Sequence, residues 1–122
     1  MKIPSRNIGY EGELLAEKYL TSKGYQILQK NFTVKGAEID IIAKDPPYVV
    51  FVEVKNYSRE DYGSMLEKIN KKKQQRIVFA AKVYLSRINA LDTLVRFDVL
   101  TILKNLDNSN KITLIKDAFR NE

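Results

Sequence analysis

The stretch that decides the fold is AEIDIIAKDPPYVVFVEVKN, residues 37–56. Its first half, residues 38–43, and its second half, residues 49–56, each have apolar side chains at every second position, and the polar side chains of residues 38–40 and 53–55 fall between them. Two prolines, Pro46 and Pro47, separate the halves. Alternation with a period of two on both sides of a proline turn predicts two antiparallel strands joined as a β-hairpin.

Patterns on both sides of this hairpin complete the predicted fold. Residues 8–23 and 64–87 carry apolar side chains at helical spacing, and Gly24 marks the end of the first helix. The resulting order, α-β-β-β-α-β-β, predicts an α/β (α+β) fold, with a mixed sheet of about five strands flanked by helices. The three strands outside the hairpin are expected at residues 25–32, 95–103 and 111–116.

The composition sets limits on the chemistry. The 122 residues match the length of a single domain, and 44% apolar with 30% charged residues is ordinary for a globular protein. There is no Cys and no His, so cysteine nucleophiles, Ser-His-Asp triads and thiolate or imidazole metal sites are excluded. Any hydrolytic chemistry must therefore use carboxylates, Lys, Tyr or Ser. Any metal must be one that prefers oxygen ligands, such as Mg²⁺ or Mn²⁺.

The charge balance favours an anionic partner. The chain has 21 Lys and Arg against 15 Asp and Glu, a net charge of +6. A basic excess of this kind favours nucleic acid as the partner. No apolar stretch approaches the ~20 residues of a membrane span, and the first residues lack the apolar core of a secretory signal. We therefore expect a cytoplasmic protein with no membrane partner.

The polar face of the hairpin gathers acidic side chains. If the turn is centred on the two prolines, Asp40 lies opposite Glu53 and Glu38 lies opposite Lys55, with all four on one face. Like charges opposite each other are destabilising, so open solvent, a cation or a protonated carboxyl must offset them. A divalent ion there would polarise a phosphate and activate a water, with Lys55 beside it. The alternative is an ordinary solvated side of a half-buried sheet. The opposite face is predicted to be core: Ile39, Ile41, Ala43, Val50, Val52 and Val54.

Six short motifs follow one another along the chain. They are G-x-x-G-E-x-x-A-x-x-Y-L at residues 9–20, G-Y-x-I-L at 24–28, E-I-D-I-I at 38–42, F-V-E-V-K at 51–55, K-Q at 73–74 and R-F-D at 96–98. In this order and spacing the chain resembles the YraN-like, or UPF0102, family. That family is related to the Holliday junction resolvases and belongs to the PD-(D/E)XK restriction-endonuclease-like superfamily. The resemblance spans about residues 8–103 and implies an endonuclease-like core there, within a single domain formed by residues 1–122.

The resemblance also implies roles for particular residues. Asp40, Glu53 and Lys55 match the catalytic residues of the superfamily, and Glu13 matches a first-helix acid that often completes the metal shell. The implied metal ligands are Asp40, Glu53 and Glu13, with Glu38 in a supporting position. The implied function is a Mg²⁺- or Mn²⁺-dependent nuclease acting on DNA, in preference to RNA, including branched or repair-intermediate DNA.

Basic residues crowd the start of the second predicted helix. Lys73 falls within the apolar stripe of that helix, where a Lys must either reach out to solvent or meet an acid. We expect Lys73, with Gln74, to point toward the acidic hairpin and support the site. Lys68, Lys71, Lys72, Lys73 and Arg76 are predicted to bind nucleic acid, and the alternative is that they form a solvated helix face.

Near the end of the chain, Arg96 and Asp98 share a strand face and are expected to form an ion pair.

Two other functions stay open at this point. One is a non-catalytic nucleic-acid-binding module on the same scaffold, which would bind in a salt-sensitive way without metal-dependent turnover. The other is a protein-interaction component in which the hairpin acids and Lys55 form surface ion pairs. A homodimer also stays open, because a resolvase-like mode of cutting would use two-fold symmetry.

Overall fold

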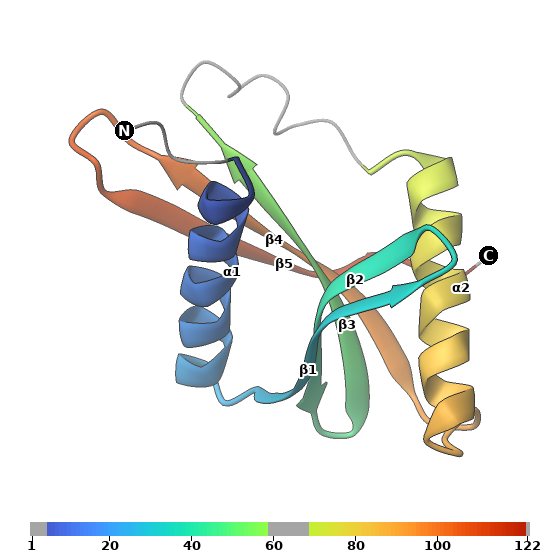
Figure 1. The fold of residues 1–122 in the computed structure, drawn as a ribbon. Helices are drawn as coiled ribbons and strands as arrows, with labels where there is room; N and C mark the ends of the chain where they lie inside the picture. The colour runs from blue at the N-terminus through green and yellow to red at the C-terminus, as the bar shows by residue number, and fades with distance from the viewer. Residues whose placement is uncertain (1–4, 59–68, 122) are drawn as a thin grey trace.

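A five-stranded mixed sheet with a helix on each face carries all the features discussed below (Figure 1). The structure is a computed structural model, and the residues it describes are 5–58 and 69–121. The predicted order of elements and the predicted fold class are confirmed. The elements are α1 (Ser5–Ser22), β1 (Gln26–Val34), β2 (Ala37–Asp45), β3 (Tyr48–Tyr57), α2 (Lys71–Arg87), β4 (Val95–Lys104) and β5 (Asn110–Phe119).

The strands lie in the sheet in the order of the chain, β1-β2-β3-β4-β5. All neighbours are antiparallel except β3 and β4, which are parallel and are joined through α2. This connection follows from chain geometry, because parallel neighbours need a crossover long enough to hold a helix. Neither described helix has the length and apolar character that spanning a lipid bilayer would require.

The predicted hairpin register is confirmed where β2 and β3 are paired. Ile41 lies opposite Val52 and Asp45 lies opposite Tyr48. Ile41 is the first residue of β2 that pairs with β3. In the preceding part of β2, residues 37–39 are paired with β1 alone, and the strands diverge there in Figure 1. The predicted pairing of Glu38 with Lys55 is therefore wrong, and Glu38 lies opposite Thr33 of β1 instead.

Both faces of the central strands are buried, so the protein has two apolar layers. The layer under α1 contains Ile41, Val50 and Val52, as predicted. The layer under α2 contains Ile39 together with Phe51, so the predicted single core face was incomplete. A sheet covered on both sides has buried residues in both alternating positions. Ile39 and Ile41 have the same parity but lie in different layers, and the residue between them is Asp40.

The second helix starts later than predicted. Residues 69 and 70 are not helical, and Asn70 is the N-cap, with its side chain accepting a hydrogen bond from the Lys73 amide at 2.8 Å. Asparagine favours this position because its side chain satisfies an amide that the helix leaves unpaired. The rest of the predicted start, residues 64–68, lies outside the described residues, and so does Lys68.

The expected ion pair between Arg96 and Asp98 is confirmed, with Nε donating to Oδ1 at 2.9 Å. Asp98 is completely buried, and it also accepts hydrogen bonds from the Tyr25 hydroxyl and the Asp117 amide. Arg96 reaches Asp45 at 3.0 Å as well. A buried carboxylate needs such partners, because an unpaired charge in the interior is strongly unfavourable. This network ties β2, β4 and β5 together.

Candidate metal centre

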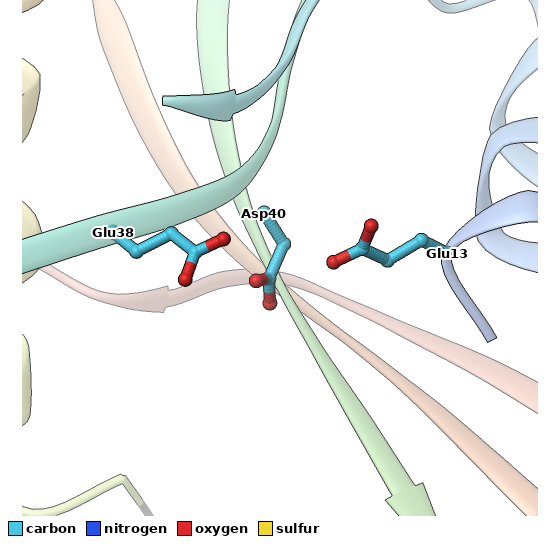
Figure 2. Close-up of side chains that lie close together, drawn as sticks. All are labelled: Glu13, Glu38 and Asp40. Atoms are coloured by element: carbon cyan, nitrogen blue, oxygen red, sulfur yellow. The ribbon is translucent and has the colours of Figure 1, made fainter. Parts of the chain in front are cut away.

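Three carboxylates from two elements meet at one point. Glu13 comes from α1, and Glu38 and Asp40 come from β2; one oxygen of each lies within 4.8 Å of the other two. Figure 2 shows Glu13 and Glu38 reaching toward Asp40 from opposite sides. Glu38 is exposed, whereas Glu13 and Asp40 are half-buried. An all-oxygen donor set of this kind suits a hard divalent cation.

The packing of α1 places Glu13 in this cluster. Ala16 and Leu20 are completely buried against the sheet and anchor the helix one and two turns after Glu13. Glu13 itself lies at the margin of the buried face, where the helical spacing predicts it.

Gly12 is a feature of the site that the sequence reasoning missed. A Cβ atom at Gly12 would lie 2.5 Å from the Asn56 Oδ1 atom of β3, closer than real Cβ atoms come. The missing side chain therefore lets α1 lie directly against β3 beside Glu13. The available signal was a glycine inside a helical pattern, which lowers helix stability by about 1 kcal/mol and usually has a packing reason.

Asp40 occupies the point where β2 and β3 separate. Its Oδ2 atom accepts a hydrogen bond from the Val54 amide at 2.8 Å, which replaces the strand pairing that ends at Ile41. Burial raises the pKa of Asp40 to about 7, and the charges of Glu53, Glu13 and Glu38 add to this effect against the Val54 hydrogen bond. The acids are therefore close enough to repel one another, and nothing among the described residues fully compensates them.

Glu53 forms a separate contact on the α2 side of the sheet. It is only 7% exposed, and its Oε1 atom lies 3.5 Å from the Lys73 Nζ atom at the start of α2. Burial raises the pKa of Glu53, while the charges of Lys73 and Lys55 lower it. The prediction that Lys73 turns toward an acid of the hairpin is confirmed by this distance.

The composition of the acidic cluster differs from the expected set. The sequence reasoning grouped Asp40, Glu53 and Glu13, whereas in the described part of the chain the third close acid is Glu38. The pairing of β2 with β3 ends at Ile41 and Val52, one residue short of Asp40 and Glu53, and Glu53 contacts Lys73. Glu53 still influences the cluster, because its charge is the largest charge effect on the pKa of Asp40.

The remaining predicted residues are Lys55, Gln74 and the basic residues of α2. Lys55 is half-buried, two residues after Glu53, and its charge acts on Glu53. The Gln74 side chain donates to the Ile69 carbonyl at 2.7 Å, so it holds the entry to α2, which differs from the predicted contact with the hairpin. Among the predicted nucleic-acid-binding residues that are described, those exposed on α2 are Lys71, Lys72 and Arg76.

Comparison with known proteins gives a consistent match along the chain. The model of the family described as "Uncharacterised protein family UPF0102" matches residues 12–102, a span that includes all four acids. A UPF0102 protein from Hahella chejuensis is 42% identical over 117 residues, covering 96% of this chain and 93% of that protein. One from Clostridium perfringens (strain SM101) is 40% identical over 121 residues, covering 98% and 99%. One from Clostridium kluyveri is 42% identical over 117 residues, covering 95% and 96%.

Proposed function

The chain belongs to the UPF0102 family, and from the acidic site in its fold we propose that it is a nuclease that hydrolyses phosphodiester bonds with the help of a divalent cation. The observation that carries the proposal is the meeting of Glu13, Glu38 and Asp40, within 4.8 Å of one another, next to the Glu53–Lys73 pair. DNA is the expected substrate in preference to RNA, and a cytoplasmic location and a two-fold dimer are parts of the same proposal.

The donor set fits Mg²⁺ or Mn²⁺. All three close side chains are carboxylates, and the chain has no Cys or His that would favour a softer metal. The raised pKa of Asp40 supports this interpretation, because burial and, to a smaller extent, the neighbouring acids disfavour a negative charge that a divalent ion would stabilise. Asp40, Glu13 and Glu38 would hold the ion, with Glu53 nearby. When bound, such an ion polarises a phosphate oxygen and lowers the pKa of a coordinated water.

The lysines near the acidic cluster would stabilise negative charge on the phosphate. A phosphodiester gains negative charge on its oxygens as the bond to the leaving group breaks, and fixed positive groups stabilise that charge. Lys73 is held beside the site by its contact with Glu53, and Lys55 follows Glu53 on the same strand. Glu53 therefore positions Lys73, and both ammonium groups lie close to the place where the phosphate would be bound.

The test is a cleavage assay at low salt with Mg²⁺ or Mn²⁺, using single-stranded, duplex, flap and four-way-junction DNA. Asp40→Asn and Glu53→Gln are expected to abolish cleavage while the far-ultraviolet circular dichroism spectrum stays unchanged. Glu11→Gln is the matched control, because it removes one exposed carboxylate from α1 outside the cluster. Cleavage by both site variants at the wild-type rate would refute the proposal.

One observation favours a second candidate, a nucleic-acid-binding module without catalysis. The helix α2 carries six basic residues and no acidic one, an arrangement that favours binding to a phosphate backbone without any catalysis. This candidate predicts salt-sensitive binding to nucleic acid and no cleavage with either ion. The cleavage assay therefore separates the two functions directly.

A further inference from the structure

The excess positive charge of the chain is concentrated on one helix. The net charge is +6, and the six basic residues of α2 equal it, because the remaining residues hold 15 basic and 15 acidic side chains. The residues outside α2 therefore sum to no net charge. The basic residues exposed on it are Lys71, Lys72, Arg76, Lys82 and Arg87.

A groove of about 240 Å³ runs along one side of this helix, between α2 and the chain after β5. Phe79 lines it with 48% of its surface exposed. Three cations line it as well, Lys71, Lys82 and Arg120, and none of the described residues that line it is acidic. Arg120 is also held by Asp117, at 2.7 Å, which fixes it beside the end of β5.

A single exposed apolar side chain does not indicate a binding site. An aromatic ring surrounded by cations does indicate which kind of ligand the groove would bind. The cations attract phosphates, and the exposed ring offers a face on which a base can stack. In a duplex both faces of each base are already covered by neighbouring bases, so only an unpaired base can use Phe79. An acidic peptide would satisfy the cations but would leave the ring without a matching planar partner.

We propose that this groove binds an unpaired stretch of nucleic acid, with a base stacked on Phe79 and its phosphates held by Lys71, Lys82 and Arg120. The proposal rests on the proposed nucleic-acid function and narrows its substrate class to molecules that contain single-stranded segments, such as flaps, gaps or frayed ends.

The groove and the contact of Lys73 with Glu53 lie on different sides of α2. At about 100° per residue, Lys71 and Lys73 point roughly 160° apart, so one lines the groove while the other contacts Glu53. Phe79 is six residues beyond Lys73, or about 9 Å along the helix axis. A strand seated in the groove would therefore reach the acidic site by crossing the first turn of α2, where Lys72 is exposed.

The proposal is tested by fluorescence anisotropy in EDTA, so that no cleavage is needed. The probes are a labelled single strand of about 15 nucleotides, the corresponding duplex, and a strand of the same length with abasic sites. Phe79→Ala and Phe79→Leu are expected to weaken binding of the single strand by about 5- to 150-fold, whereas Phe79→Tyr retains it. Duplex binding is expected to stay unchanged in all three variants.

The abasic strand provides an internal control. It keeps the phosphates and lacks the bases, so the wild-type protein should bind it more weakly by the same factor, and Phe79→Ala should cause no further loss. Lys82→Gln is expected to weaken binding of every probe and to reduce its dependence on salt concentration, because it removes a phosphate contact.

Several outcomes would overturn the proposal. These are wild-type binding of the single strand by Phe79→Ala, an equal loss for duplex and single strand, or competition by polyglutamate as strong as competition by the oligonucleotide. The nuclease proposal fails by a different result, namely absence of cleavage with unchanged binding. If Phe79→Ala unfolds the protein, the Phe79→Tyr variant and the abasic strand still decide the question.

Discussion

Replacing Asp40 with Asn is expected to stabilise the metal-free protein at and above neutral pH. Burial and the neighbouring acids raise the pKa of Asp40 to about 7 in the folded protein, from an ordinary value of 3.8. An amide has nearly the same shape as the carboxyl group and keeps an oxygen for the Val54 N–H, which Asp40 accepts at 2.8 Å. The substitution therefore removes the charge without removing the hydrogen bond.

The sign and size of the effect follow from proton linkage. Between pH 3.8 and about 7 the folded protein keeps the Asp40 proton that the unfolded chain has lost. Because the folded state binds more protons, the free energy of unfolding falls as pH rises, by up to about 1.4 kcal/mol per pH unit. Over about three pH units, the free energy of unfolding of the wild-type protein therefore falls by about 4 kcal/mol in total. The Asp40→Asn variant does not undergo this loss. The two proteins should thus have similar stability near pH 4 and differ most near pH 8.

The measurement is urea denaturation in EDTA at about pH 4, 6 and 8, followed by far-ultraviolet circular dichroism. Glu11→Gln serves as the control for loss of one negative charge from the same region, because Glu11 is exposed and lies outside the acidic cluster. The reasoning is refuted if Asp40→Asn is less stable than the wild type at pH 8, or if the difference between them is the same at all three pH values.

The same two proteins should respond differently to a divalent ion. An ion that binds only the folded state at ten times its dissociation constant raises the free energy of unfolding by about 1.4 kcal/mol. We expect Mg²⁺ or Mn²⁺ to stabilise the wild-type protein at pH 8 and to leave Asp40→Asn unchanged. Equal stabilisation of both would mean that Asp40 is not a ligand.

Two further substitutions probe how the site is held together. Gly12→Ala should lower the affinity for Mn²⁺ by less than about tenfold, because the new Cβ lies 2.5 Å from Asn56 Oδ1 and the exposed Asn56 side chain must turn away if α1 is to stay in place. Thermal-shift titration with Mn²⁺ measures this, and Gly12→Ala combined with Asn56→Ala should restore the affinity; no rescue would contradict the steric explanation. Lys73→Met should destabilise the protein by about 1 kcal/mol at neutral pH, a small value because the Lys73 side chain is 42% exposed. The loss should shrink in acid, as Glu53 becomes protonated, and an equal loss at pH 5 and pH 8 in urea denaturation would argue against the pair.

The fold was predictable wherever the information is local. Alternation along residues 38–43 and 49–56, together with the proline turn between them, defines a hairpin and also its register, because the turn fixes which residues face each other. The point where the two strands separate was not predictable in this way. It depends on β2 following β1 past Ile41, which is a long-range arrangement that leaves no signal in the hairpin itself.

The site was predictable to the extent that its residues carry recognisable motifs or break a pattern. Asp40 was identified from the alternation of the hairpin and Lys73 from its position within an apolar stripe, whereas the resemblance supplied the catalytic role of Asp40 and the place of Glu13 in the metal shell. The role of Glu38 was underestimated, because it depends on where β2 leaves β3. The start of α2 at Lys71, with Asn70 as its N-cap, was missed, because Ile69 continues the apolar spacing of the helix and this outweighs the weaker signal of a capping residue.

The charge arrangement of the molecule explains why an ion and a helix would both be needed for function. A phosphodiester is an anion, and three carboxylates within 4.8 Å of one another would repel it. A divalent ion reverses that repulsion at the acids, and Lys55 and Lys73 add positive charge on the β3 and α2 side. Without the ion, nucleic acid would still be attracted to α2, whose charge equals the net charge of the chain, and to Arg120 beside it. If both proposals hold, binding to the helix should persist in EDTA while contact with the acids is lost, because the helix would retain the strand and the ion would admit its phosphate to the acids.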